Sequence, residues 1–147
     1  MFKQLLVPID GTALSARAIE QALTLAKQLG AGVTGFVVEA MPALPGMGIH
    51  LANYQREVKV HEAQTEAHAK KLLGGFEQAA SAAGVPYRGE YERNDDVAAA
   101  IASMADRDRC DMIVMTTHGR GAFGELLFGS QTKRVLSLTK LPLLILR

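Results

Sequence analysis

Residues 111–130 have the sequence DMIVMTTHGRGAFGELLFGS, in which an apolar run leads through a glycine-rich stretch to a serine. The run from Asp111 to Thr117 contains Met-Ile-Val-Met and predicts a buried strand. Four glycines follow within eleven residues: Gly119, Gly121, Gly124 and Gly129. Ser130–Thr139 then has the pattern of a short helix, and Pro142–Leu146 predicts a last strand. A buried strand that leads through a turn into a helix favours an α/β fold.

The rest of the chain alternates between strand and helix patterns in the same way. Apolar runs predict three further strands, at Gln4–Ile9, Val33–Val38 and Val85–Tyr91. Helical spacing of apolar residues predicts one helix at Ala13–Leu29 and a longer one from about Asn53 to about Ala83. Gly30 stands where a helix C-cap glycine would.

Two local signals refine the expected helices. Gly74 and Gly75 lie inside the long helix and together cost ~2 kcal/mol relative to two alanines, so we expect a bend there or a helix divided in two. Asn94 is a good N-cap for a third helix, whose apolar stripe would be Val97, Ile101 and Met104. Five strands and four helices then alternate. Connections of this length require parallel neighbours and right-handed crossovers, so we predict one five-stranded parallel sheet with helices on both faces.

The composition limits the classes of protein that the chain can belong to. With 147 residues, of which 48% are hydrophobic and 21% charged, it has the composition of one globular domain over residues 1–147. A net charge of +1 argues against binding nucleic acid through the overall charge. The apolar runs are far shorter than the ~20 residues of a membrane span. The lone Cys110 and a start without the signal-peptide pattern lead us to expect a cytoplasmic protein without disulfides.

Ligands of such sheets bind beyond the carboxyl ends of the strands, where the strand order reverses. Two stretches qualify, Pro8–Thr12 and Thr116–Ser130. Glycines let a phosphate approach the backbone, and a helix N-terminus offers free N–H groups at the positive end of a dipole. Residues 117–147 carry five Lys or Arg and one acid, a charge of +4, whereas the other 116 residues carry −3. The pattern favours a phosphate-bearing ligand, although glycines that only shape a loop beside a solvated basic face would give the same pattern.

Asp10 ends the first predicted strand, and two roles are open to it. Its carboxylate can accept a hydrogen bond from a purine amine or a ribose hydroxyl, or it can serve the Asp-Gly-Thr turn and helix cap locally. Residues 119–124 also match the dinucleotide pattern G-x-G-x-x-G, but no acid follows Glu125 to hold a ribose, so NAD and FAD are not expected. The Walker pattern G-x-x-x-x-G-K-[ST] does not occur in the sequence.

The histidines, the cysteine and the serines predict neither a catalytic residue nor a metal centre. His61 and His68 lie seven residues apart, which is wider than the usual metal-binding spacing, so we predict a solvated helix face. Cys110 directly precedes a buried strand and has no C-x-x-C partner, which is typical of an inert, partly buried thiol. No serine lies in a G-x-S-x-G pattern.

These residues together resemble the universal stress protein family over nearly the whole chain. Leu5–Asp10 is similar to the family's first strand with its terminal aspartate, and Thr12–Ala22 is similar to the helix that follows. The most specific motif of nucleotide-binding members is a glycine, two residues, a second glycine, nine residues, and a third glycine followed by Ser or Thr. Here Gly119 matches the second glycine, and nine residues separate it from Gly129-Ser130. Thr116 occupies the place of the first glycine.

The resemblance implies a Rossmann-like fold of the adenine nucleotide alpha hydrolase type, with strand order 3-2-1-4-5. It also implies a site for ATP or another adenine nucleotide, with or without Mg²⁺, and a homodimer paired through the last strand, Leu141–Leu146. The residues that it places near the adenine and ribose are Pro8, Ile9, Asp10, Val38, Met115 and Thr116. Those that it places around the phosphates are His118, Gly119, Gly129, Ser130 and Gln131. We add Arg120 to the residues expected around the phosphates, because of its charge and position.

Three functions remain open at this point. The first is a stress-response or signalling module that binds an adenine nucleotide. The second is a dimeric interaction module that no longer binds nucleotide, because Thr116 adds a β-branched side chain where the nucleotide could need the space; its hydroxyl could instead bond the ribose. The third is at most weak ATP hydrolysis, for which Glu125 is the one candidate base and can equally be an exposed surface acid. The residues do not indicate a protein partner.

Overall fold

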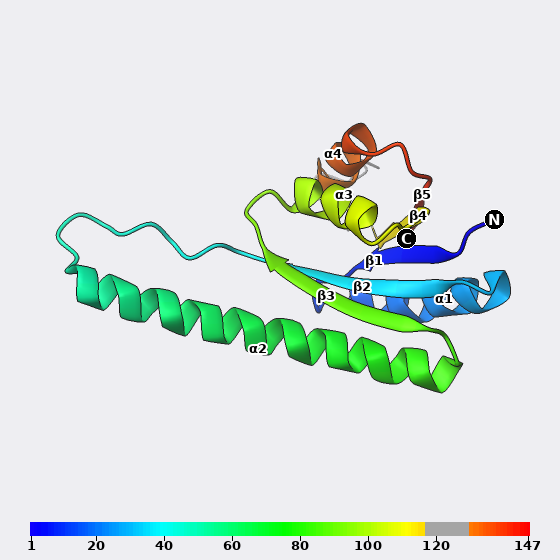
Figure 1. Ribbon diagram of the computed structural model, residues 1–147, viewed down its shortest axis with the longest axis horizontal. Coiled ribbons are helices and arrows are strands. Elements are labelled where there is room, and N and C mark those ends of the chain that lie inside the picture. Colours follow the sequence, from blue (N-terminus) through cyan, green and yellow to red (C-terminus); the bar gives the residue numbers. More distant parts are fainter. Residues whose placement is uncertain (117–129) are drawn as a thin grey trace.

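The computed structural model describes residues 1–116 and 130–147. Its strands are β1 (Gln4–Pro8), β2 (Gly32–Glu39), β3 (Tyr87–Arg93), β4 (Met112–Thr116) and β5 (Leu143–Leu146). Its helices are α1 (Ala13–Leu29), α2 (Leu51–Ala83), α3 (Val97–Arg107) and α4 (Ser130–Leu138). The strands form one parallel sheet in the order β3-β2-β1-β4-β5 (Figure 1). The predicted parallel sheet and its strand order are confirmed.

The sheet carries an apolar core on each face, because successive side chains of a strand point to opposite sides. In β1, Leu5 and Val7 belong to the core that packs against α1 and α2, whereas Leu6 belongs to the core under α3 and α4. Figure 1 shows the same division, with α2 on one side of the sheet and with α3 and α4 on the other. The predicted helices on both faces are therefore present.

The central position of β1 determines where a ligand can bind. β1 pairs with β2 on one side and with β4 on the other. The chain leaves β1 toward β2 and returns later to add β4 and β5 on the other side. The strand order therefore reverses between β1 and β4, and their carboxyl ends lie next to each other.

Helix α1 begins and ends as its sequence predicts. The side chain of Thr12 caps its N-terminus by accepting a hydrogen bond from the Ser15 backbone N–H at 3.3 Å. Gly30 ends it in the left-handed conformation, at φ 64°, which a glycine adopts without a steric cost. The predicted C-cap is confirmed.

Three local expectations were wrong. Helix α2 runs without interruption through Gly74 and Gly75, because the flanking Leu73 and Phe76 are buried against the sheet and hold this segment in place. The N-cap of α3 is Asp96 and not Asn94: Asp96 accepts from the Ala99 N–H at 3.1 Å, while Asn94 accepts from the Asp96 N–H. Strand β3 begins and ends two residues later than predicted, because pairing with β2 continues to its last residue.

The longest helix, α2, has 33 residues, and its buried residues, Ala69, Leu73, Phe76 and Ala80, all lie in its C-terminal half. Within residues 1–116 and 130–147, no helix has both the length and the apolar character needed to cross a membrane.

Candidate functional site

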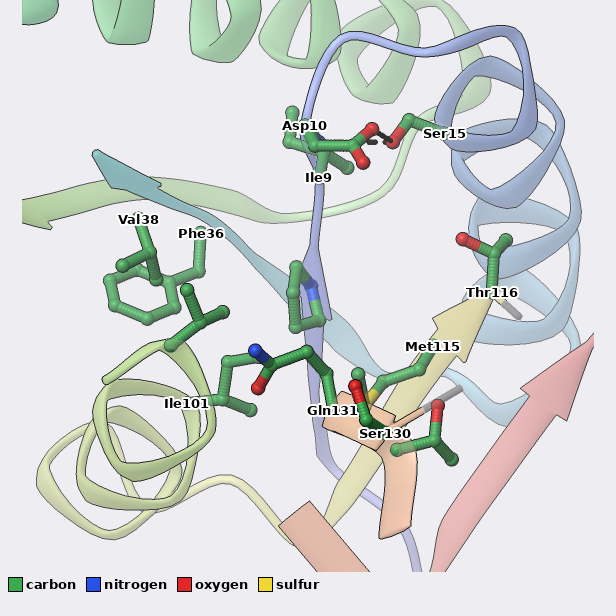
Figure 2. Close-up of a pocket in the computed structure, with 13 residues that line it drawn as sticks. Ile9, Asp10, Ser15, Phe36, Val38, Ile101, Met115, Thr116, Ser130 and Gln131 are labelled. Carbon is green, nitrogen blue, oxygen red and sulfur yellow. Dashed lines mark hydrogen bonds between the residues drawn. The ribbon is translucent and has the colours of Figure 1, made fainter. Parts of the chain in front are cut away.

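A pocket of about 310 Å³ lies at the carboxyl ends of β1, β2 and β4, beside the first turn of α4 (Figure 2). Eight of the twelve predicted site residues line it: Pro8, Ile9, Asp10, Val38, Met115, Thr116, Ser130 and Gln131. The other four, His118, Gly119, Arg120 and Gly129, lie outside the described residues. The structure thus brings together residues from both candidate stretches.

One wall of the pocket is apolar. Phe36 and Val38 come from β2, and Val97 and Ile101 come from α3. Met115 of β4 adds a further apolar side chain to this wall. Phe36, Ile101 and Met115 also belong to the core under α3 and α4, so this wall is a rigid continuation of that core. A flat, apolar ring system of a ligand would fit against it.

The opposite rim is polar and is built around Asp10. Its Oδ1 accepts hydrogen bonds from the Thr12 N–H at 3.0 Å, the Thr12 hydroxyl at 2.7 Å and the Ser15 hydroxyl at 2.6 Å. The Ser15 hydroxyl also accepts from the Asp10 N–H at 3.0 Å. Gly11 between them has φ 81°, which allows the sharp turn from β1 into α1. The local role proposed for Asp10 is thus present, and the same bonds hold its carboxylate at the edge of the pocket.

Thr116 and Ser130 complete the polar rim. Thr116 is the last residue of β4 and pairs with Leu146 of β5. In Figure 2 its hydroxyl faces the side of the pocket on which Asp10 and Ser15 lie. Ser130 is the first residue of α4, where backbone N–H groups of a helix lack partners within the helix. These groups suit a ligand with hydroxyl or anionic groups.

Sequence reasoning missed five residues that line the pocket: Ser15, Phe36, Val97, Ile101 and Thr132. Phe36 has a signal in the sequence, because it lies two residues before Val38 and so on the same face of β2. Val97 and Ile101 belong to the apolar stripe predicted for the third helix, but they are not among the predicted site residues. Ser15 and Thr132 had no sequence signal, since neither belongs to a motif that the sequence shows.

Two histidines of α2 make hydrogen bonds, whereas the sequence predicts only a solvated helix face for them. His61 Nε2 lies 2.8 Å from the Ala40 carbonyl oxygen, and His68 Nδ1 lies 2.5 Å from Glu39 Oε1. They hold α2 against the end of β2, although the His68 side chain is 52% exposed. In the described part of the chain, no three His, Cys, Asp or Glu side chains form a group that could hold a metal ion.

Cys110 is buried, and its thiol lies 3.9 Å from Thr34 Oγ1. Burial raises the pKa of Cys110 to about 11, which keeps it protonated and unreactive at neutral pH. The predicted inert thiol agrees with this environment.

Comparison with known proteins identifies the family of the chain. The model of the universal stress protein family matches residues 1–147. The chain belongs to the universal stress protein family. A universal stress protein of Thermus aquaticus is 32% identical and one of Bacillus subtilis, YxiE, is 28% identical, each aligned over 100% of both chains.

Solved structures of universal stress proteins share the fold. One, a universal stress protein in complex with cAMP, is 19% identical, covers 99% of this chain and 97% of its own, and has a TM-score of 0.71. Another, from Archaeoglobus fulgidus in complex with dAMP, is 19% identical, covers 99% of this chain and 98% of its own, and has a TM-score of 0.63. At these identities the likeness concerns the fold.

Proposed function

We propose that this universal stress protein is a stress-response or signalling module that binds ATP or a related adenine nucleotide in the pocket between the ends of β1 and β4. The observation that carries the proposal is the pocket itself, which joins an apolar wall to a polar rim at the reversal of strand order. Its volume of about 310 Å³ lies at the lower end of the range for small-molecule sites. Two proteins of the same fold bind cAMP and dAMP, which are adenine nucleotides.

Each part of the pocket suits one part of the nucleotide. Phe36 and Val38 would contact the faces of the base, because removing these apolar faces from water favours binding. Asp10, oriented by its bonds to Ser15, would accept from the ribose hydroxyls. Ser130 and the N-terminus of α4 would receive the phosphates. His118, Gly119, Arg120 and Gly129 remain proposed phosphate contacts, and Mg²⁺ would enter only with the phosphates.

The first test identifies what the purified protein carries. The protein is purified without added nucleotide and denatured, and any released small molecule is identified by mass spectrometry. ATP and AMP are then titrated by calorimetry. We expect an adenine nucleotide either on the purified protein or bound in the titration. Protein that is empty after purification and does not bind either nucleotide contradicts the proposal.

A pair of matched variants shows whether binding occurs in this pocket. Val38→Phe adds a ring to the apolar wall, whereas Val60→Phe makes the same change on α2, where Val60 is 54% exposed. We expect Val38→Phe to weaken nucleotide binding at least tenfold and Val60→Phe to leave it unchanged. Equal affinities for the two variants would place the nucleotide elsewhere.

A second function is supported by Thr116, which lines the pocket where the family motif has a glycine. In this alternative, the chain is an interaction module whose pocket no longer accepts a nucleotide. Thr116→Gly removes the side chain, and Thr116→Val keeps its shape but removes the hydroxyl. Binding that appears only in Thr116→Gly favours this alternative. Weaker binding in Thr116→Val than in the wild type shows instead that the hydroxyl contacts the nucleotide.

We also propose that the protein forms a homodimer through Leu141–Leu146. Strand β5 is at the edge of the sheet and has the apolar sequence Leu-Leu-Ile-Leu, which is half-buried. An open apolar edge favours pairing with another strand. Ile145→Lys tests this, because a lysine on an edge strand opposes edge pairing. In sedimentation we expect a wild-type dimer and an Ile145→Lys monomer, and a wild-type monomer at micromolar concentration contradicts the proposal.

A further inference from the structure

Gln131 is the second residue of α4 and lines the pocket. It is exposed, and within residues 1–116 and 130–147 its carboxamide has no hydrogen-bond partner. A carboxamide offers both donors and acceptors without a charge. The Gln131 side chain is therefore available to a ligand in the pocket.

The packing of α4 directs Gln131 toward α3. Val135 is fully buried in the core that also contains Ile101, and Arg134 Nη2 lies 2.8 Å from Asp96 Oδ2 at the N-cap of α3. Residues three and four apart share one face of a helix, so Gln131 lies on the face of α4 that carries Arg134 and Val135. Figure 2 shows its carboxamide extending from α4 toward Ile101.

The wall that Gln131 approaches offers a base no polar partner from its side chains. Phe36, Val97 and Ile101 are hydrocarbon side chains that can contact only the faces of a purine. The edge of a purine keeps its hydrogen-bonding groups, and leaving them unpaired away from water would weaken binding. On the other rim, the hydroxyl of Ser15 is engaged with Asp10.

We propose that the Gln131 carboxamide contacts the polar edge of the bound purine and makes the pocket prefer a purine with a 6-amino group. This inference rests on the proposed nucleotide binding. Adenine presents an amino donor beside a ring-nitrogen acceptor, and a glutamine carboxamide is complementary to such a pair. It assigns the Gln131 side chain to the base, whereas the family resemblance places this residue at the phosphates. The ion pair between Arg134 and Asp96 positions the residue by holding α4 beside α3.

The test compares two ligands that differ in one group. AMP and purine riboside 5′-monophosphate, which lacks the 6-amino group, are titrated by calorimetry into the wild type, Gln131→Leu and Gln64→Leu. Gln64 is exposed on α2 and does not line the pocket, so its variant is the matched control. We expect the wild type and Gln64→Leu to prefer AMP by about three- to tenfold. In Gln131→Leu we expect the ratio of the affinities for AMP and for the analogue to fall to about one, because AMP binds more weakly and the analogue does not.

The outcomes separate the base contact from nucleotide binding itself. An equal loss of both ligands in Gln131→Leu would place the side chain at the phosphates or the ribose and overturn the inference, as would an unchanged preference for AMP. A wild type that binds neither ligand defeats the proposed function and the base contact together. Thermal melting checks that the variants fold. If Gln131→Leu does not fold, the comparison is repeated with Gln131→Met, whose side chain is closer in length to glutamine.

Discussion

Replacing Gly35 by alanine tests how closely α2 packs on the sheet. Gly35 lies in β2, opposite Gly89 of β3. A Cβ atom added at Gly35 would lie 2.6 Å from Tyr87 Oη and 2.7 Å from Phe76 Cδ1. Both distances are shorter than real Cβ contacts, so the two rings or the backbone would have to shift.

The two rings have little freedom to move. Phe76 is fully buried, and its ring centroid lies 4.9 Å from that of Tyr87. The Tyr87 hydroxyl donates to the Leu73 carbonyl oxygen at 3.1 Å, and burial raises the pKa of this phenol. Overpacking of a core costs ~1–3 kcal/mol, and loss of the hydrogen bond adds ~1 kcal/mol. We therefore expect Gly35→Ala to lower the free energy of unfolding by about 2–4 kcal/mol.

Urea unfolding followed by circular dichroism measures this change, and Gly75→Ala is its control. A Cβ atom at Gly75 meets nothing within 4 Å, and Gly75 lies inside α2. Alanine there should raise the free energy of unfolding by up to ~1 kcal/mol, because it is the better helix former. The same substitution then has opposite signs at the two positions. A Gly35→Ala protein as stable as the wild type would refute the packing argument.

Three further predictions concern the thiol, the ion pair and the turn. Cys110, with a pKa of about 11, should resist alkylation in the native protein at pH 8 and react after unfolding in urea; rapid native labelling would contradict its burial. The hydrogen bond from Arg134 lowers the pKa of Asp96, so this pair stabilises the fold above the ordinary pKa of 3.8. The contribution of the pair is lost as the pH falls through the lowered pKa of Asp96. Wild type and Arg134→Met should therefore differ in unfolding free energy at pH 6 and converge near pH 2. A difference in unfolding free energy that stays constant with pH would mean that the ion pair does not cause it. Ser15→Ala should cost about 1–2 kcal/mol and weaken nucleotide binding, because it removes both bonds to Asp10; calorimetry and urea unfolding measure the two effects, and unchanged values would contradict this role of Ser15.

The local features of the fold followed from the sequence, because they depend on near neighbours in the chain. The α1 helix begins after Thr12 and ends at Gly30, and both ends rest on residue types whose caps have known geometry. The long helix was expected to bend or to divide in two, because only the helix propensities of Gly74 and Gly75 were counted. Packing of Leu73 and Phe76 on the sheet outweighs those propensities.

The candidate site was predictable where its residues end a strand or begin a helix. Thr116 ends β4, Ser130 begins α4, and Asp10 lies two residues after the end of β1; parallel strands bring such residues to one edge of the sheet. Phe36 and Ile101 are ordinary core residues in the sequence, and only the open end of the core turns them into a wall of the pocket.

By itself, the sequence determined the alternation of strands and helices, and thus a parallel sheet whose candidate ligand end lies near Asp10 and Thr116, because periodicity and turn residues act locally. The strand order came from the family resemblance and was confirmed by the structure. Only the tertiary structure decided that Gln131 reaches toward Ile101, 30 positions earlier in the chain. That approach depends on how α4 packs on α3, through Val135 and the bond between Arg134 and Asp96, and no local pattern encodes the contact of two separate helices.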